Sequence, residues 1–213
     1  MPKFKAVLFD KDGVLIDSLD TCMDAFNDAL VHYQKPTLSR EGFVREVWGV
    51  KAEQVIGNIF FERSGHERAE ILKFYSNSRA RRESKTKLFS STVPTLQMLR
   101  AAGMKTAVVT NTVKRTALKL LNDFGILQYF DDVVGGDEAE PKPSPAPVLL
   151  ACEHLGIRPE EALYVGDTPT DAKAGKAAGC TTAIITTSRN AVDLAEIGGV
   201  LVIDDLNELL DIV

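Results

Sequence analysis

The chain has 213 residues, with 25 Lys and Arg against 30 Asp and Glu, which gives a formal net charge of −5. Its hydrophobic content of 45% and charged content of 26% are ordinary for a globular protein and exclude general disorder. The acidic balance argues against a nucleic-acid partner bound through phosphates, and the length fits one large domain or a core with a smaller insert.

Cysteine usage and hydropathy indicate the compartment. The three cysteines form no C-x-x-C pair and have no histidine at zinc-ligand spacing, so we expect free thiols. The apolar stretch before Asp10 is shorter than the core of a signal peptide, and no run approaches the ~18 residues of a membrane span. We therefore expect a cytoplasmic protein with neither a membrane nor a nucleic-acid partner.

The N-terminal region combines one strand with a long helical stretch. Residues 4–9 form an apolar run typical of a buried strand. After it, Leu19, Met23, Phe26 and Leu30 recur at helical spacing, and the following residues up to 90 contain further helical patterns without a strand. Because about 70 residues are too many for a structureless connection, we expect a helical insert at 18–90.

The C-terminal part alternates short β-branched runs with helical patterns, which is typical of βαβ units. Glycines follow the helical patterns at positions that suit the end of a helix. The expected strands are 105–110, 132–134, 162–165, 181–185 and 200–203, and the expected helices are 95–102, 113–124, 146–155, 170–178 and 191–197. We predict an α/β fold: a Rossmann-like parallel sheet core, formed by 1–17 and 91–213, with an all-helical domain inserted after the first strand.

Polar side chains follow several of the expected strands. In an open α/β sheet, ligands bind at the carboxyl ends of the strands. The residues found there are Asp10, Asp12, Thr110, Asn111, Lys142, Asp167 and Asp171. Each short cluster alone also fits a turn, a helix cap or a rigid loop. Together they indicate a site for a divalent cation and an anion. A calcium loop is excluded, because such a loop needs Gly at its sixth position and Glu at its twelfth, whereas in a loop that begins at Asp10 the glycine, Gly13, is fourth and Thr21 is twelfth.

These residues resemble the four motifs of the haloacid dehalogenase (HAD) superfamily, specifically its phosphatases with a helical C1-type cap. The similar segments, in order, are Asp10-Lys-Asp-Gly-Val-Leu-Ile-Asp-Ser18, Val109-Thr-Asn111, Lys142 within Pro-Lys-Pro-Ser-Pro145, and Val165-Gly-Asp-Thr-Pro-Thr-Asp171. The segments Gly125-Ile-Leu-Gln-Tyr-Phe130 and Gly135-Gly-Asp137 are similar to the phosphoglycolate phosphatase branch. The resemblance implies that the helical insert is a cap domain that selects the substrate.

The resemblance also implies a mechanism for a small-molecule phosphomonoester substrate. Asp10 would be the nucleophile that forms an aspartyl phosphate, and Asp12 would be the general acid and then the general base. A Mg²⁺ ion would be held by Asp10, the backbone carbonyl of Asp12 and Asp167, with Asp171 supporting the metal shell. Lys142 would neutralise the phosphoryl oxygens, and the remaining two residues, Thr110 and Asn111, would bind the phosphate.

Several alternatives stay open from the sequence. A sugar phosphomutase or a pyrophosphatase of the same superfamily would use the same nucleophile. A dehalogenase is disfavoured because its members do not keep the second aspartate, here Asp12, and a Schiff-base phosphonatase would need a cap lysine, for which Lys51 is a candidate. A receiver-like phosphoacceptor module, which also uses Asp, Thr, Lys and Mg²⁺, would be a signalling protein and not an enzyme.

Overall fold

The chain folds into two compact units. The computed structural model describes residues 4–188 and 198–213, so the helix expected at 191–197 lies outside the described residues. The core unit is Met1–Asp17 with Leu88–Val213, and the helical unit is Ser18–Lys87. Among the described residues, none of the helices is both long enough and apolar enough to cross a membrane.

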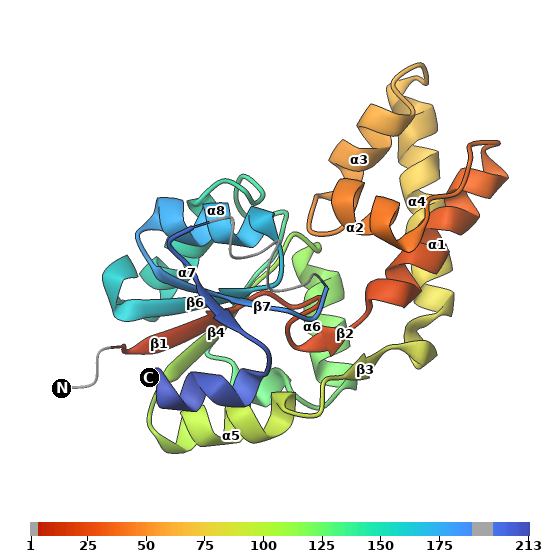
Figure 1. The fold of residues 1–213 in the computed structure, drawn as a ribbon. Coiled ribbons are helices and arrows are strands. Elements are labelled where there is room, and N and C mark those ends of the chain that lie inside the picture. Colours follow the sequence, from red (N-terminus) through yellow and green to blue (C-terminus); the bar gives the residue numbers. More distant parts are fainter. Residues whose placement is uncertain (1–3, 189–197) are drawn as a thin grey trace. The chain divides into compact units, whose positions relative to one another are not determined.

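The core unit is built on six parallel strands (Figure 1). They are β1 (Ala6–Phe9), β4 (Lys105–Val109), β5 (Asp132–Val134), β6 (Ala162–Gly166), β7 (Thr181–Ile185) and β8 (Leu201–Ile203). Their spatial order is β5-β4-β1-β6-β7-β8. Phe9 pairs in register with Val108 of β4 and Val165 of β6, so the three central strands end at nearly the same level. The predicted α/β class and parallel sheet are confirmed.

Helices cover both faces of the sheet, which explains why its central strands read as continuous apolar runs. Val7 and Phe9 of β1 pack in a core cluster with α5 (Thr92–Ala101) and α6 (Lys114–Asp123). Ala6 and Leu8 pack on the opposite face with α7 (Ala146–Leu155) and α8 (Pro169–Ala178). In Figure 1, α5 and α7 lie on opposite sides of the sheet. The described part of the core unit also contains the 3-10 helices η2 (Leu127–Tyr129), η3 (Pro159–Glu161) and η4 (Leu206–Asp211).

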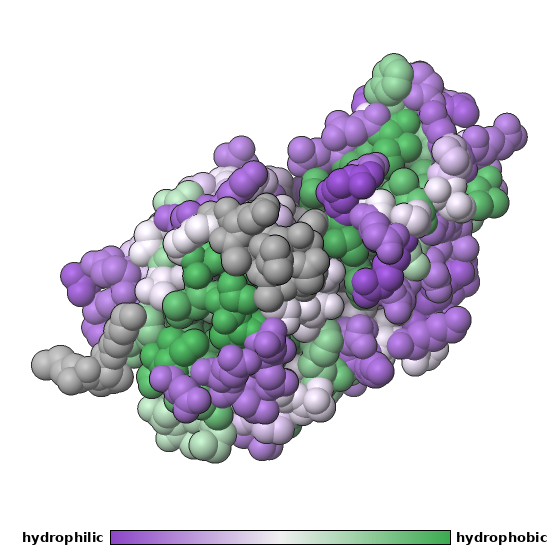
Figure 2. All heavy atoms as spheres, in the orientation of Figure 1, coloured by the Kyte–Doolittle hydropathy of each residue, from purple (hydrophilic) through white to green (hydrophobic). Residues whose placement is uncertain are grey.

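The sheet ends at strand β8, an edge strand. Figure 2 shows a hydrophobic area over this part of the core unit. Leu201 and Val202 of β8 are 40% and 36% exposed, while Ile203 is buried in the core cluster. Apolar burial is therefore incomplete at this edge.

The helical unit has its own hydrophobic core. Its helices are α1 (Leu19–His32), α2 (Arg40–Glu46), α3 (Ala52–Ile59) and α4 (Gly65–Arg81), followed by the 3-10 helix η1 (Glu83–Lys85). Phe26 of α1 packs edge-on against Tyr75 of α4, with ring centroids 5.6 Å apart. The ring centroid of Phe43 of α2 lies 6.0 Å from that of Phe26. At the start of α4, Ser64 and Glu67 form a capping box, which satisfies backbone donors that the first turn leaves open.

Two short strands carry the chain out of the core unit and back. β2 (Ile16–Asp17) and β3 (Lys87–Leu88) form a separate two-stranded sheet. Leu88 packs against the core cluster, and the backbone N–H of Phe89 donates to the carbonyl of Leu15 at 3.3 Å. Residues 88–90, which the sequence pattern placed in the insert, therefore belong to the core unit.

Candidate active site

The expected site residues lie at the carboxyl edge of the sheet. From β1 the chain runs outward through β4 and β5 and then returns to β6 on the other side of β1. The strand order therefore reverses beside β1, which is the place where open α/β sheets bind their ligands. The ladder continues one residue past the strands: the N–H of Asp10 donates to Val165 at 2.8 Å, and that of Thr110 to Val134 at 3.0 Å. Asp10 and Thr110 are thus fixed at neighbouring positions of this edge.

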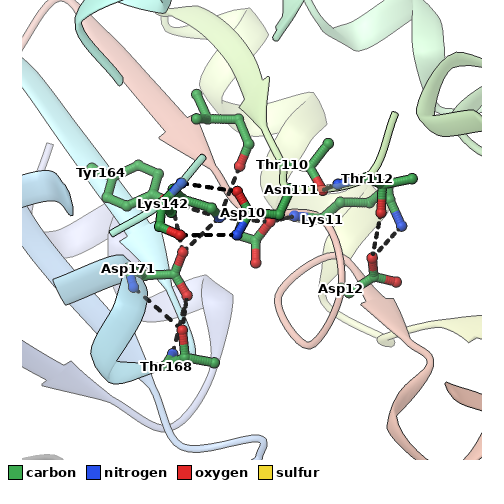
Figure 3. Close-up of polar contacts among 11 residues, drawn as sticks. Asp10, Lys11, Asp12, Thr110, Asn111, Thr112, Lys142, Tyr164, Thr168 and Asp171 are labelled. Carbon is green, nitrogen blue, oxygen red and sulfur yellow. Dashed lines mark hydrogen bonds and ion pairs between the residues drawn. The ribbon is translucent and has the colours of Figure 1, made fainter. Parts of the chain in front are cut away.

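Lys142 joins two buried carboxylates at the centre of the site (Figure 3). Its ammonium lies 3.0 Å from Oδ1 of Asp10 and 2.6 Å from Oδ1 of Asp171. It also donates to the hydroxyl of Tyr164 at 3.0 Å and to the carbonyl of Val109 at 3.1 Å. The side chain of Lys142 is 2% exposed, so these contacts replace the water that the charge has lost.

The charges of this cluster shift one another's pKa values. Burial raises the pKa of Asp10 to about 7, against the opposing attraction of Lys142 and with the repulsion of Asp171 and Asp12 adding to the rise. Burial alone would lower the pKa of Lys142, but the two carboxylates outweigh it and raise that pKa. Asp10 is therefore only partly ionised at neutral pH unless a further positive charge binds beside it.

Asp171 is fixed by the start of α8. Burial acts to raise its pKa, but Lys142 and the hydrogen bonds that the carboxylate accepts lower it. Oδ1 accepts from Lys142 and from the hydroxyl of Tyr164 at 2.7 Å, and Oδ2 accepts from the backbone and side chain of Thr168 in a capping box. A Cβ on Gly166 would lie 2.1 Å from Cβ of Asp171, so glycine is needed for this close approach. Both carboxylate oxygens are thus engaged in orienting the site.

The donor set suits a divalent cation. Carboxylate oxygens of Asp10, Asp167 and Asp171 lie within 4.8 Å of one another, and all three residues are buried. Gly13 has φ +80°, and a Cβ there would lie 2.2 Å from Oδ2 of Asp167, so the loop after β1 approaches this carboxylate closely. Hard oxygen ligands with an excess of negative charge fit Mg²⁺. Because both carboxylate oxygens of Asp171 already accept hydrogen bonds from protein donors, Asp10 and Asp167 are better placed to bind a metal ion through their side chains.

Asn111 contacts the backbone of the loop that carries Lys142. Its side-chain oxygen accepts from the N–H of Lys142 at 3.0 Å, and its side-chain nitrogen donates to the carbonyl of the same residue at 3.2 Å. The hydroxyl of Thr110 accepts from the N–H of Thr112 at 3.1 Å. Asn111 therefore holds the lysine loop in place, and the phosphate-binding roles of Asn111 and Thr110 stay predictions.

Asp12 lies beside the cluster but is not among the three grouped carboxylates. Its Oδ2 accepts from Nζ of Lys11 at 2.5 Å and from the hydroxyl of Thr112 at 3.3 Å. Its expected metal contact through the backbone carbonyl stays a prediction.

Four further residues of the site were not predicted from the sequence: Lys11, Thr112, Tyr164 and Thr168. The alternation in β6 gave a usable indication for Tyr164, because Ala162, Tyr164 and Gly166 share the face that carries α8.

Tyr164→Phe is expected to weaken the site moderately. The hydroxyl stays protonated, because burial and the nearby carboxylates raise the pKa of Tyr164 well above its ordinary value. Its loss removes a donor to Asp171 and an acceptor for Lys142. We expect a loss of about 1–2 kcal/mol in the free energy of unfolding, measured by urea denaturation, and a several-fold lower turnover. An unchanged stability would contradict the importance of these hydrogen bonds.

The fold and the site define an α/β protein with a buried acidic site where the strand order of a doubly wound parallel sheet reverses. The chain matches the model of the haloacid dehalogenase-like hydrolases over residues 7–185, and it belongs to this family. It is 34% identical to phosphoglycolate phosphatase 1 of Pseudomonas aeruginosa, covering 97% of this chain and 78% of the relative. It is 37% identical to the phosphoglycolate phosphatase of Aquifex aeolicus, covering 84% of each chain.

Solved structures agree with this assignment. A predicted phosphoglycolate phosphatase from Haemophilus somnus is 26% identical, with a TM-score of 0.87 and coverage of 100% of this chain and 99% of that one. A putative haloacid dehalogenase-like hydrolase from Bacteroides fragilis is also 26% identical, with a TM-score of 0.88 and coverage of 97% and 100%. The expected family, its phosphoglycolate phosphatase-like branch and the class of phosphoric monoester hydrolase are confirmed.

Proposed function

We propose that the protein is a Mg²⁺-dependent phosphatase that hydrolyses a small phosphomonoester, most like phosphoglycolate, through an aspartyl phosphate on Asp10. The observation that carries the proposal is the buried cluster in which Lys142 bridges Asp10 and Asp171 beside Asp167. It combines a carboxylate nucleophile, a fixed cation for phosphoryl oxygens and oxygen ligands for a metal. The similarity to phosphoglycolate phosphatases supports the choice of substrate.

In the proposed mechanism, a carboxylate oxygen of Asp10 attacks phosphorus while Asp12 protonates the leaving alkoxide. The carboxylate of Asp12 then takes a proton from the water that hydrolyses the acyl phosphate. Lys142 stabilises the charge on the phosphoryl oxygens, and Asp171 holds the ammonium in position. A bound Mg²⁺, held by Asp10 and Asp167 with the backbone of Asp12, would supply Lewis-acid charge stabilisation to the same oxygens.

The helical unit would serve as the cap domain of this enzyme, with the core unit carrying the chemistry. We place the activity in the cytoplasm, because Cys22, Cys152 and Cys180 are free thiols that a reducing compartment maintains.

Metal binding is expected to depend on pH. Asp10 keeps its proton below about pH 7 in the metal-free protein because its pKa is raised by burial. Mg²⁺ must displace that proton, so its affinity should fall up to about tenfold per pH unit below 7 and level off above it. Calorimetric titration between pH 5.5 and 8.5, in two buffers of different ionisation enthalpy, measures both the affinity and the proton released. EDTA should silence turnover reversibly.

Asp167→Asn is the matched variant, since it replaces a proposed metal ligand while Asp10, Lys142 and Asp171 stay in place. It should weaken Mg²⁺ binding at every pH. Full activity in EDTA, or Mg²⁺ binding that is independent of pH over this range, would contradict the proposed metal site.

A substrate panel distinguishes the remaining alternatives. Wild-type protein is incubated with phosphoglycolate, sugar phosphates, pyrophosphate and p-nitrophenyl phosphate in the presence of Mg²⁺, and products are followed by ³¹P NMR. Release of inorganic phosphate from phosphoglycolate supports the proposal. An isomerised sugar phosphate would indicate a mutase, and preferential cleavage of pyrophosphate a pyrophosphatase. A stoichiometric phosphoprotein without turnover would favour the receiver-like module, against which membership of the hydrolase family argues.

A further inference from the structure

Lys11, next to the proposed nucleophile, is a fully buried lysine. Its side chain is 0% exposed, which is rare for an ammonium group and costly unless the charge is paired. Its Nζ lies 2.5 Å from Oδ2 of Asp12, while its backbone N–H donates to Oδ1 of Asp10 at 2.7 Å. One residue therefore contacts both proposed reacting carboxylates, one with its backbone and the other with its side chain.

A second residue holds the same oxygen of Asp12. The hydroxyl of Thr112 donates to Oδ2 at 3.3 Å, and its backbone N–H donates to the hydroxyl of Thr110 at 3.1 Å. Thr112 is thereby tied to the loop that follows β4, whereas Lys11 belongs to the loop that follows β1. In Figure 3, Asp12 points toward Thr112 and the amine of Lys11, and Asp10 points toward Lys142. Two separate loops thus fix the direction of the Asp12 carboxylate.

The stability of the fold does not explain why position 11 is occupied by a buried lysine. An apolar side chain of similar length would fill the space without desolvating a charge. The ammonium is instead directed to the carboxylate that exchanges protons in the proposed reaction. Proton transfer needs this carboxylate within hydrogen-bond reach of the leaving oxygen, and a misplacement of about 1 Å can cost on the order of 100-fold in rate.

We propose that Lys11 and Thr112 are positioning residues that hold Asp12 in the direction required for general acid catalysis. This inference rests on the proposed phosphatase function. The side chain of Asp12 is 17% exposed and that of Lys11 is sealed, so a substrate can reach the carboxylate and not the amine that anchors it. The two residues act through Asp12.

The test uses leaving groups of different acidity. An alkoxide such as that of phosphoglycolate needs protonation to leave, whereas p-nitrophenolate is stable as an anion near neutral pH. Because kcat/KM reports the steps up to departure of the leaving group and not the later hydrolysis of the acyl phosphate, Lys11→Met and Thr112→Val should each lower kcat/KM for phosphoglycolate by about tenfold or more. They should lower kcat/KM for p-nitrophenyl phosphate by less than about threefold. Thr112→Ser, which keeps the hydroxyl, should restore the wild-type ratio. In an Asp12→Asn background, neither substitution should lower the rate further.

Thr106→Val is the matched control. Thr106 is a buried threonine of β4 whose hydroxyl donates to the carbonyl of Tyr129, away from Asp12. It should lower stability and leave the ratio of the two substrates unchanged. If Lys11→Met does not fold, the comparison of Thr112→Val with Thr112→Ser still tests the inference.

Equal losses on both substrates, or losses that persist undiminished in the Asp12→Asn background, would overturn the inference and leave the phosphatase function intact. A wild-type protein that turns over neither substrate would overturn the proposed function, and the inference with it.

Discussion

Replacing Asp10 with asparagine is expected to abolish turnover, by at least about a thousandfold, because an amide cannot form the acyl phosphate intermediate. The geometry should survive, since the asparagine oxygen can still accept from Lys142 and from the N–H of Lys11. Phosphate release from the best substrate of the panel measures the loss. Retention of more than a few per cent of activity would contradict the assignment of the nucleophile.

The same substitution should stabilise the metal-free protein. Because burial raises the pKa of Asp10 from 3.8 to about 7, the folded state keeps a proton that the unfolded chain releases. Stability contributed by the protonated form is present below about pH 4 and is lost as pH rises through about 7. Asp10→Asn removes this loss, so above pH 7 its free energy of unfolding should exceed that of the wild type, by at most about 4 kcal/mol.

Urea denaturation in EDTA at several pH values tests this expectation. The advantage of the variant should shrink as pH falls from 8 to 4. Asp123→Asn is the matched control, because Asp123 is exposed on the same unit and pairs with the surface residue Lys119. It should change stability by less than about 0.5 kcal/mol. A less stable Asp10→Asn variant at pH 8 would show that Asp10 supports the fold.

Lys142→Met is expected to have the largest effect on stability. Its ammonium is within 3.0 Å of two buried carboxylates, and its removal leaves Asp10 and Asp171 facing each other. Loss of one partner of a buried ion pair costs about 3–5 kcal/mol, and turnover should fall by about 100-fold or more. Since Lys142 lowers the pKa of Asp171, its contribution is present above about pH 4 and is lost as pH falls through the lowered value.

The stability difference between wild type and Lys142→Met should therefore shrink in acid. The double variant Lys142→Met/Asp171→Asn should recover much of the stability without recovering activity, which separates folding from chemistry. Lys119→Met, on an exposed pair, is the control. An unaltered melting temperature for Lys142→Met at pH 7.5 would contradict a structural role for the bridge.

The sheet was predictable because its strands are short apolar runs separated by helical patterns and glycines. The five strands β4 to β8 lie where the sequence pattern predicted strands, to within one residue at each end. The first strand, β1, lies within the apolar run at residues 4–9. β2 and β3 were not predicted, since two-residue strands carry no periodicity. The insert was expected to end at residue 90, whereas the helical unit ends at Lys87. Only tertiary packing assigns Leu88 to the core, and the sequence pattern does not show it.

The site was predictable as a gathering of residue types and not as a set of contacts. Strand order brings Asp10, Lys142 and Asp171 to one edge, which follows from the topology of parallel sheets. The sequence does not reveal that Asn111 pairs with the backbone of Lys142, or that Lys11 is buried, because both depend on side-chain rotamers and on loops meeting across the edge. Contacts of this kind are set by packing and not by periodicity.

The pairing of β2 with β3 has a consequence for the topology of the chain. The helical unit leaves the core at Asp17 and returns at Lys87, and these two points belong to adjacent strands of one small sheet. A short connection could join them without altering the register of any strand in the core. The insert is thus topologically a detachable module, one that can be lengthened, shortened or exchanged while the reacting groups keep their places.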